Sequence, residues 1–212
     1  MQATSSGIVV AAAKVLSIPA ATTPVPTAFY DTVIAAAKYL VKESAERHRR
    51  VILVVSDGDD NFSNVVKDLT MAEYRANQKG AATSSKAHQN LLERRQGAVL
   101  EVQRSAQQAD AAFYSINPGG PSIHLNEIST RAQNAMESIA QSTGGTAYVP
   151  EAERDLERVF NEIAAELRGQ YLLQYYSNSQ TAGAGFRRIV VTLPAHQELR
   201  IRARQGYYPK AK

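Results

Sequence analysis

Three carboxylates stand close together directly after a strongly apolar segment of the sequence. Asp57, Asp59 and Asp60 belong to the Ser-Asp-Gly-Asp-Asp-Asn run of residues 56–61, which follows five consecutive aliphatic residues, 51–55. Crowded like charges are unfavourable unless solvent or a cation screens them. Oxygen ligands without a neighbouring His or Cys favour a hard cation such as Mg²⁺. The alternative is a solvated acidic turn whose Asp-Gly supplies tight geometry, and the loop alone supports both interpretations about equally.

Two known acidic motifs can be compared with this loop. A calcium loop of the EF-hand type would need Gly where Phe62 stands and would end at Asp68, so we reject it. The first motif of haloacid-dehalogenase-type phosphohydrolases is a closer match, because an apolar strand precedes Asp57-x-Asp59. In such an enzyme Asp57 would be the nucleophile and Asp59 the acid/base. That family usually has Thr or Val where Asn61 stands, and no later acidic Mg²⁺ motif is evident.

The elements that must position the loop alternate between helical and strand patterns. A helix is predicted after Thr27, strands over 51–55, 111–116 and 146–149, and further helices over 86–109 and 127–142 and through the apolar stripe Leu156, Val159, Phe160, Ile163 and Leu167. The all-aliphatic run 51–55 predicts a strand buried on both faces. A short helix is also predicted over 7–17. This alternation predicts a doubly wound, Rossmann-like α/β domain over residues 1–168.

The last part of the chain has a different pattern. After Gly169 the apolar residues alternate, which predicts antiparallel β segments over 171–176, 186–193 and 199–203. Residues 169–212 are therefore interpreted as a C-terminal β extension of the domain.

The motifs together resemble a known family. Residues 26–33 (Pro-Thr-Ala-Phe-Tyr-Asp-Thr-Val) and the strand that ends in Val-Ser-Asp57-Gly-Asp-Asp-Asn resemble a von Willebrand factor type A (VWFA) domain. The strand over 113–116 and the helix that ends at Gly144-Gly145 extend the same resemblance. The run 168–176, the segment 186–193 and Arg202-x-Arg204-x-Gly-Tyr-Tyr208 are similar to the tail of the bacterial VWFA-related proteins of acidobacterial type. The resemblance covers about residues 20–209.

The resemblance implies a metal-ion-dependent adhesion site and a protein-binding role without catalysis. By motif position Thr27 and Asp57 would take part in holding Mg²⁺, with Ser56, Asp59 and Asp60 as weaker candidates. In that family a partner protein typically offers an acidic residue that completes the metal's coordination. Relatives are usually exported, so the resemblance implies that the complete protein acts outside the cell or in its envelope.

The sequence departs from the family in one segment. No Asp-x-Ser-x-Ser motif is present, and the family's first strand and helix are not evident. We therefore expect a fragment of a bacterial VWFA domain, N-terminally incomplete, whose metal site is incomplete in this chain. The alternatives are a Mg²⁺-dependent phosphohydrolase using Asp57 and Asp59, and a metal-free structural domain.

Composition and charge exclude other classes. The chain of 212 residues has no Cys, which excludes thiolate metal sites and cysteine nucleophiles, and it has neither a Gly-x-Ser-x-Gly nor a Gly-Lys-Ser/Thr motif. No apolar run is long enough to cross a membrane. Residues 168–212 carry eight basic residues and one acid, including Arg200, Arg202 and Arg204 on alternate positions. Without a recognition motif we expect no nucleic acid partner, and an acidic partner, an anionic envelope surface or a structural cover of the sheet remain open.

Overall fold

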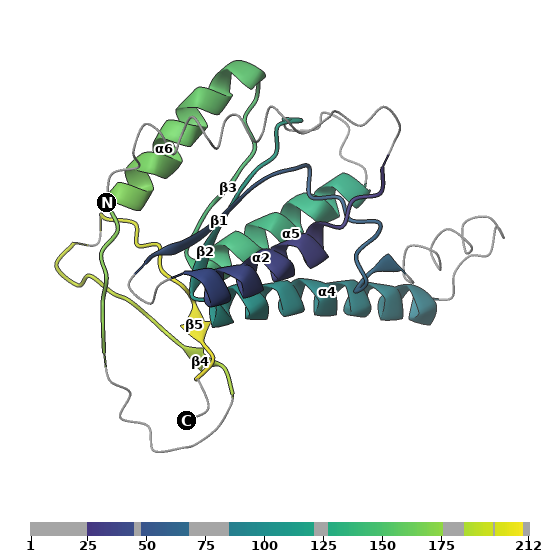
Figure 1. Ribbon diagram of the computed structural model, residues 1–212, viewed down its shortest axis with the longest axis horizontal. Helices are drawn as coiled ribbons and strands as arrows, with labels where there is room; N and C mark the ends of the chain where they lie inside the picture. The colour runs from purple at the N-terminus through teal and green to yellow at the C-terminus, as the bar shows by residue number, and fades with distance from the viewer. Residues whose placement is uncertain are drawn as a thin grey trace.

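The computed structural model describes residues 25–44, 48–67, 85–120, 127–175, 185–196 and 198–209, and within them a parallel sheet lies between helices (Figure 1). The sheet has the order β1 (Arg50–Val55), β2 (Ala111–Ile116), β3 (Ala147–Tyr148). All neighbouring strands are parallel, with Ile52 opposite Phe113 and Ser115 opposite Ala147. The predicted mixed α/β architecture with a parallel sheet is confirmed. The helix predicted over 7–17 lies outside the described residues.

Three helices cover one face of the sheet. They are α2 (Phe29–Glu43), α4 (Ser85–Gln108) and α5 (Glu127–Thr143). Their apolar stripes bury a core with the side chains of β1 and β2 that point to this face; its fully buried members include Val33, Val102, Phe113, Met136 and Ile139. This core fixes α2 beside the end of β1, where the acidic loop begins.

A single helix, α6 (Leu156–Arg168), packs on the opposite face, preceded by the short 3-10 turn η1 (Glu153–Asp155) (Figure 1). Val159 and Ile163 of this helix pack with the buried side chains of Tyr114 and Ile116. The predicted stripe is therefore confirmed at its centre, whereas Phe160 is 43% exposed. No helix in the described ranges is long and apolar enough to span a membrane.

The prediction that residues 51–55 form a strand buried on both faces is wrong. Leu53 is 42% and Val55 is 54% exposed, although Ile52 is buried. In the part of the chain that the structure describes, β1 pairs with β2 alone and therefore forms an edge of the sheet. The helix α6 packs on Val51, but it leaves Leu53 and Val55 exposed on the same face.

The C-terminal extension contains less β structure than its sequence pattern indicates. Among the described residues of the extension, only β4 (Arg187–Arg188) and β5 (Gly206–Tyr207) pair, antiparallel, with Arg187 opposite Tyr207. Residues 171–175 and 200–203 adopt no regular secondary structure and Leu199 lies in a bend, so the strands predicted there are wrong. An alternating pattern specifies a strand only where a neighbouring strand supplies hydrogen bonds, and the described residues supply none there.

The extension is nevertheless attached to the α/β domain through its charges. Arg202 forms an ion pair of 2.9 Å with Glu166 and donates a hydrogen bond of 2.6 Å to the hydroxyl of Thr146. Arg204 forms an ion pair with Asp110. The backbone N–H of Gln205 donates to the carbonyl of Ser142 at 3.1 Å. Two of the three alternating arginines therefore bind the domain, which favours a structural cover over a free basic surface.

Candidate cation site at the carboxyl ends of the strands

The acidic loop begins with a tight turn directly after β1. The N–H of Gly58 donates to the hydroxyl of Ser56 at 3.1 Å, and the N–H of Asp59 donates to the carboxylate of Asp57 at 3.1 Å. Gly58 adopts a positive φ of 77°, and a Cβ there would lie 2.8 Å from the side chain of Met136. Both constraints require glycine at this position. The turn leaves the side chain of Asp57 exposed to solvent.

Asp60 has a structural role that the sequence did not indicate. Its Oδ2 accepts hydrogen bonds from the N–H of Tyr30 at 2.7 Å and the hydroxyl of Ser63 at 2.5 Å. Its Oδ1 accepts from the N–H groups of Phe62 at 3.2 Å and Ser63 at 2.9 Å. Asp60 is 5% exposed, so the view of it as a solvated turn residue is wrong. Its carboxylate satisfies the free N–H of Tyr30 at the start of α2 and two N–H groups of the loop, and each of its oxygens already accepts two hydrogen bonds.

Thr27 is joined to the same loop through its backbone. Its N–H donates to Oδ1 of Asn61 at 2.8 Å. Its carbonyl accepts from the N–H groups of Asn61 and Phe62, both at 3.1 Å. The two segments that carry the principal predicted ligands, Thr27 and Asp57, therefore lie together at the carboxyl edge of the sheet. The side chains of both residues are exposed.

Asp31 reinforces this connection from the first turn of α2. Its N–H donates to the hydroxyl of Ser63 at 2.9 Å, and its Oδ2 accepts from the backbone and the side-chain amide of Asn64 at 2.9 and 2.8 Å. A carboxylate in the first turn also interacts favourably with the helix dipole. Asp31 therefore supports the loop and the helix together. Ser63 and Asn64 were missed by sequence reasoning, since no local pattern reveals bonds to a helix some 30 residues away.

The pKa of Asp59 is perturbed by its surroundings. It is half-buried, and burial followed by the neighbouring charge of Asp57 raises its pKa above the ordinary value for aspartate. The backbone N–H of Asp60 and the guanidinium of Arg95 act in the opposite direction. Asp59 therefore holds a proton more readily than an ordinary aspartate side chain.

The oxygen types at this edge are those that a cation retaining much of its water accepts. Thr27 and Asp57 present exposed hydroxyl and carboxylate oxygens, the ligand types that Mg²⁺ accepts from proteins while keeping several waters. Among the described residues, no three His, Cys, Asp or Glu side chains converge as a complete metal-binding group. The three loop carboxylates have different environments: Asp57 is exposed, Asp59 is half-buried and Asp60 is buried.

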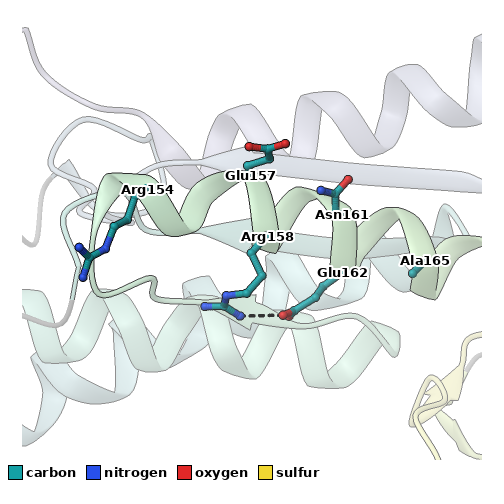
Figure 2. Close-up of a pocket in the computed structure, with 6 residues that line it drawn as sticks. All are labelled: Arg154, Glu157, Arg158, Asn161, Glu162 and Ala165. Atoms are coloured by element: carbon teal, nitrogen blue, oxygen red, sulfur yellow. Dashed lines mark hydrogen bonds and ion pairs between the residues drawn. The ribbon is translucent and has the colours of Figure 1, made fainter.

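A separate hollow lies along α6. It measures about 570 Å³ and is lined by Arg154, Glu157, Arg158, Asn161, Glu162 and Ala165 (Figure 2). The side chains stand along one helix and its preceding turn, and Arg158 pairs with Glu162 at 2.6 Å. The lining residues come from η1 and α6 alone, and none comes from the acidic loop. This hollow is a solvated helix face with an i, i+4 ion pair.

Comparison with known proteins assigns no family to the chain. No protein-family model matches it, and no curated protein or solved structure is similar to it at a significant level.

Proposed function

We propose that this protein is a non-enzymatic protein-binding module of the VWFA type. Its contact site would be the exposed carboxyl edge of the sheet, where Thr27 and Asp57 take part in holding Mg²⁺. A partner protein would supply an acidic residue to the same ion. The observation that carries the proposal is the set of hydrogen bonds between Thr27 and Asn61, which joins the two predicted ligand segments.

The differing environments of the loop residues support this assignment. Asp60 stabilises the loop from within: one of its four hydrogen bonds comes from Tyr30 of α2, and the other three come from Phe62 and Ser63 of the loop. Asp57 receives one backbone hydrogen bond at Oδ1 and is exposed, which leaves carboxylate lone pairs for a cation. Because the loop is already ordered, binding of an ion to its exposed carboxylate would cost little further conformational entropy.

The chemistry of a bound Mg²⁺ explains the class of partner. Few protein ligands and an octahedral preference leave coordination positions for water or for an incoming oxygen. A carboxylate on a partner offsets the ion's remaining charge better than a neutral oxygen. The module would therefore bind acidic side chains and would lose this binding when the divalent ion is removed.

Paramagnetic broadening by Mn²⁺ tests the proposed site without a known partner. Mn²⁺ prefers oxygen ligands as Mg²⁺ does. We expect amide signals of residues 27 and 57–61 to broaden first and to recover on addition of excess Mg²⁺. Glutarate should bind only in the presence of the divalent ion. The matched variants are Asp57→Ala, which should abolish selective broadening, and Glu101→Ala on the exposed side of α4, which should not. Broadening that begins elsewhere would disprove the site.

A phosphohydrolase is the second candidate, favoured by the raised pKa of Asp59. In this mechanism the carboxylate of Asp57 attacks the phosphorus of a phosphate ester, and Asp59 protonates the departing alkoxide. Water then hydrolyses the acyl phosphate and regenerates Asp57. Turnover of a generic phosphate ester with Mg²⁺, lost in both Asp57→Asn and Asp59→Asn, would establish this reading. Absence of turnover at every pH between 5 and 8 would remove it.

A further inference from the structure

Two tyrosine side chains from separate segments of the C-terminal extension lie in contact. Tyr175 belongs to the segment that follows α6, and Tyr207 belongs to β5. Their ring centroids are 6.2 Å apart and the ring planes are inclined by 75°, an edge-to-face arrangement. A hydrogen bond between the two phenol groups is the main reason that the pKa of Tyr175 lies above its ordinary value of 10.0. The contact therefore brings the hydroxyl ends of the two rings together.

Tyr207 is held in place by contacts on both sides of its backbone and ring. Its strand pairs with β4, where Tyr207 lies opposite Arg187. The guanidinium of Arg204 lies 5.9 Å from the centroid of the Tyr207 ring, and Arg204 also forms an ion pair with Asp110 of the α/β domain. The position of this phenol is therefore fixed relative to the domain.

The neighbouring tyrosines have different surroundings. The ring of Tyr208 packs with Phe186 at 5.3 Å and lies 4.9 Å from the guanidinium of Arg104. Tyr171, at the start of the segment that carries Tyr175, is 93% exposed. Tyr175 itself is 58% exposed, so a solute can reach its ring while the phenol remains bonded to Tyr207.

We propose that Tyr175 and Tyr207 form an intramolecular dityrosine cross-link when the protein meets a one-electron oxidant, such as a peroxidase supplied with hydrogen peroxide. Each phenol gives up one electron and its hydroxyl proton and becomes a phenoxyl radical. The two radicals combine through a ring carbon next to each oxygen, which forms one carbon–carbon bond. The hydrogen on each joined carbon then moves to the oxygen and restores the aromatic ring. Two electrons and two protons leave the protein, and they reduce one hydrogen peroxide to two waters.

The arrangement favours a link within one chain. Two radicals held in contact react at a high effective concentration, whereas radicals on separate chains must first meet by diffusion. The chain has no Cys, so no thiol of its own competes as the reductant of a tyrosyl radical. The new bond closes a covalent loop between the segment after α6 and β5. A loop of this kind stabilises the extension mainly by restricting the unfolded chain.

Peroxidase treatment of the protein, followed by trypsin digestion and mass spectrometry, tests the proposal. We expect the peptide of residues 169–187 to be joined to the peptide of residues 205–210, with a mass lower than their sum by two hydrogen atoms. The product should keep the mass of one chain, and its yield should not fall when the protein is diluted. The absence of joined peptides, or joined peptides found only in covalent dimers, would overturn the proposal.

Phenylalanine variants assign the link to these two residues. Tyr175→Phe and Tyr207→Phe keep the aromatic ring but cannot form a phenoxyl radical, so each should abolish the joined peptides. The matched controls are Tyr171→Phe, Tyr176→Phe and Tyr208→Phe, each of which removes another phenol from the same two peptides. The controls should keep the link. A link that survives in Tyr175→Phe or Tyr207→Phe, or that disappears in a control, would contradict the assignment.

Discussion

The acidic loop and the basic C-terminal extension are both strongly charged, but their charged side chains have different roles. In the extension, Arg202 and Arg204 are paired with Glu166 and Asp110 and bind the extension to the α/β domain. In the loop, the buried carboxylate of Asp60 accepts hydrogen bonds from the backbone, whereas the side chain of Asp57 remains exposed. A cluster of like charge therefore does not itself identify a binding site. The candidate for binding is the charged residue that no ion pair within the described structure neutralises, here Asp57.

Asp60→Ala is expected to have the largest effect on stability. The substitution removes the acceptor for Tyr30 at the start of α2 and for two N–H groups of the loop. Loss of a helix cap and of charged hydrogen bonds should lower the free energy of unfolding by about 3 kcal/mol. Chemical denaturation measures it. Asp57→Ala, three residues earlier, is the matched control and should stay within about 0.5 kcal/mol of the wild type. Equal losses would mean that the two carboxylates do not differ as described.

Arg202→Ala should have a smaller effect that separates the extension from the loop. The substitution leaves Glu166, whose side chain is 13% exposed, without its cation. We expect a loss of about 1 to 2 kcal/mol in the free energy of unfolding. Arg200→Ala, at a neighbouring exposed position, should cost less than about 0.5 kcal/mol. If both variants cost the same, the extension is not held to the domain by this ion pair.

Tyr114→Phe should change the pH dependence of stability, because Tyr114 bonds to Glu166, the residue that pairs with Arg202 of the extension. The hydroxyl of Tyr114 donates to Glu166 at 3.0 Å. Burial, followed by the charge of Glu166, raises the pKa of this phenol above its ordinary value of 10.0. Above about pH 10 the unfolded chain releases this proton and the folded protein retains it, so unfolding becomes easier as pH rises.

The difference between the two proteins isolates this contribution. The free energy of unfolding of the wild type should exceed that of Tyr114→Phe by a constant amount below pH 10, and the excess should shrink above it. Urea denaturation at several alkaline pH values measures both curves. An excess that is independent of pH would show that Tyr114 titrates normally in the folded protein.

The order of the helices and strands was predictable because it rests on local patterns. The stripe along α6 and the aliphatic run of β1 each specify an element within one short segment. The burial of Leu53 was predicted wrongly because it depends on which elements lie beside β1. The strands predicted over 171–176 and 199–203 were wrong for the same reason, because an alternating pattern does not show whether a neighbouring strand is available for pairing.

The position of the acidic loop at the carboxyl edge of the sheet was predictable, but the hydrogen bonds that each of its residues makes were not. The position of Asp57 after a strand indicates the carboxyl edge of the sheet. Asp60 follows the same strand, and its role differs from that of Asp57 because it accepts a hydrogen bond from Tyr30, 30 residues earlier at the start of α2. The bond from Thr27 to Asn61 is likewise long-range, spanning 34 residues. Single-sequence patterns do not contain such contacts.

Calorimetric titration of Mg²⁺ and Mn²⁺ into the wild type, Asp57→Ala and Thr27→Ala is the direct test of a cation site at this edge of the sheet. Glu101→Ala is the control for the loss of one surface carboxylate. We expect one ion per chain for the wild type and for the control, no binding to Asp57→Ala and weaker binding to Thr27→Ala. Binding that survives in Asp57→Ala, or no binding to the wild type, would contradict a cation site at this edge, and the latter result would leave a metal-free structural domain.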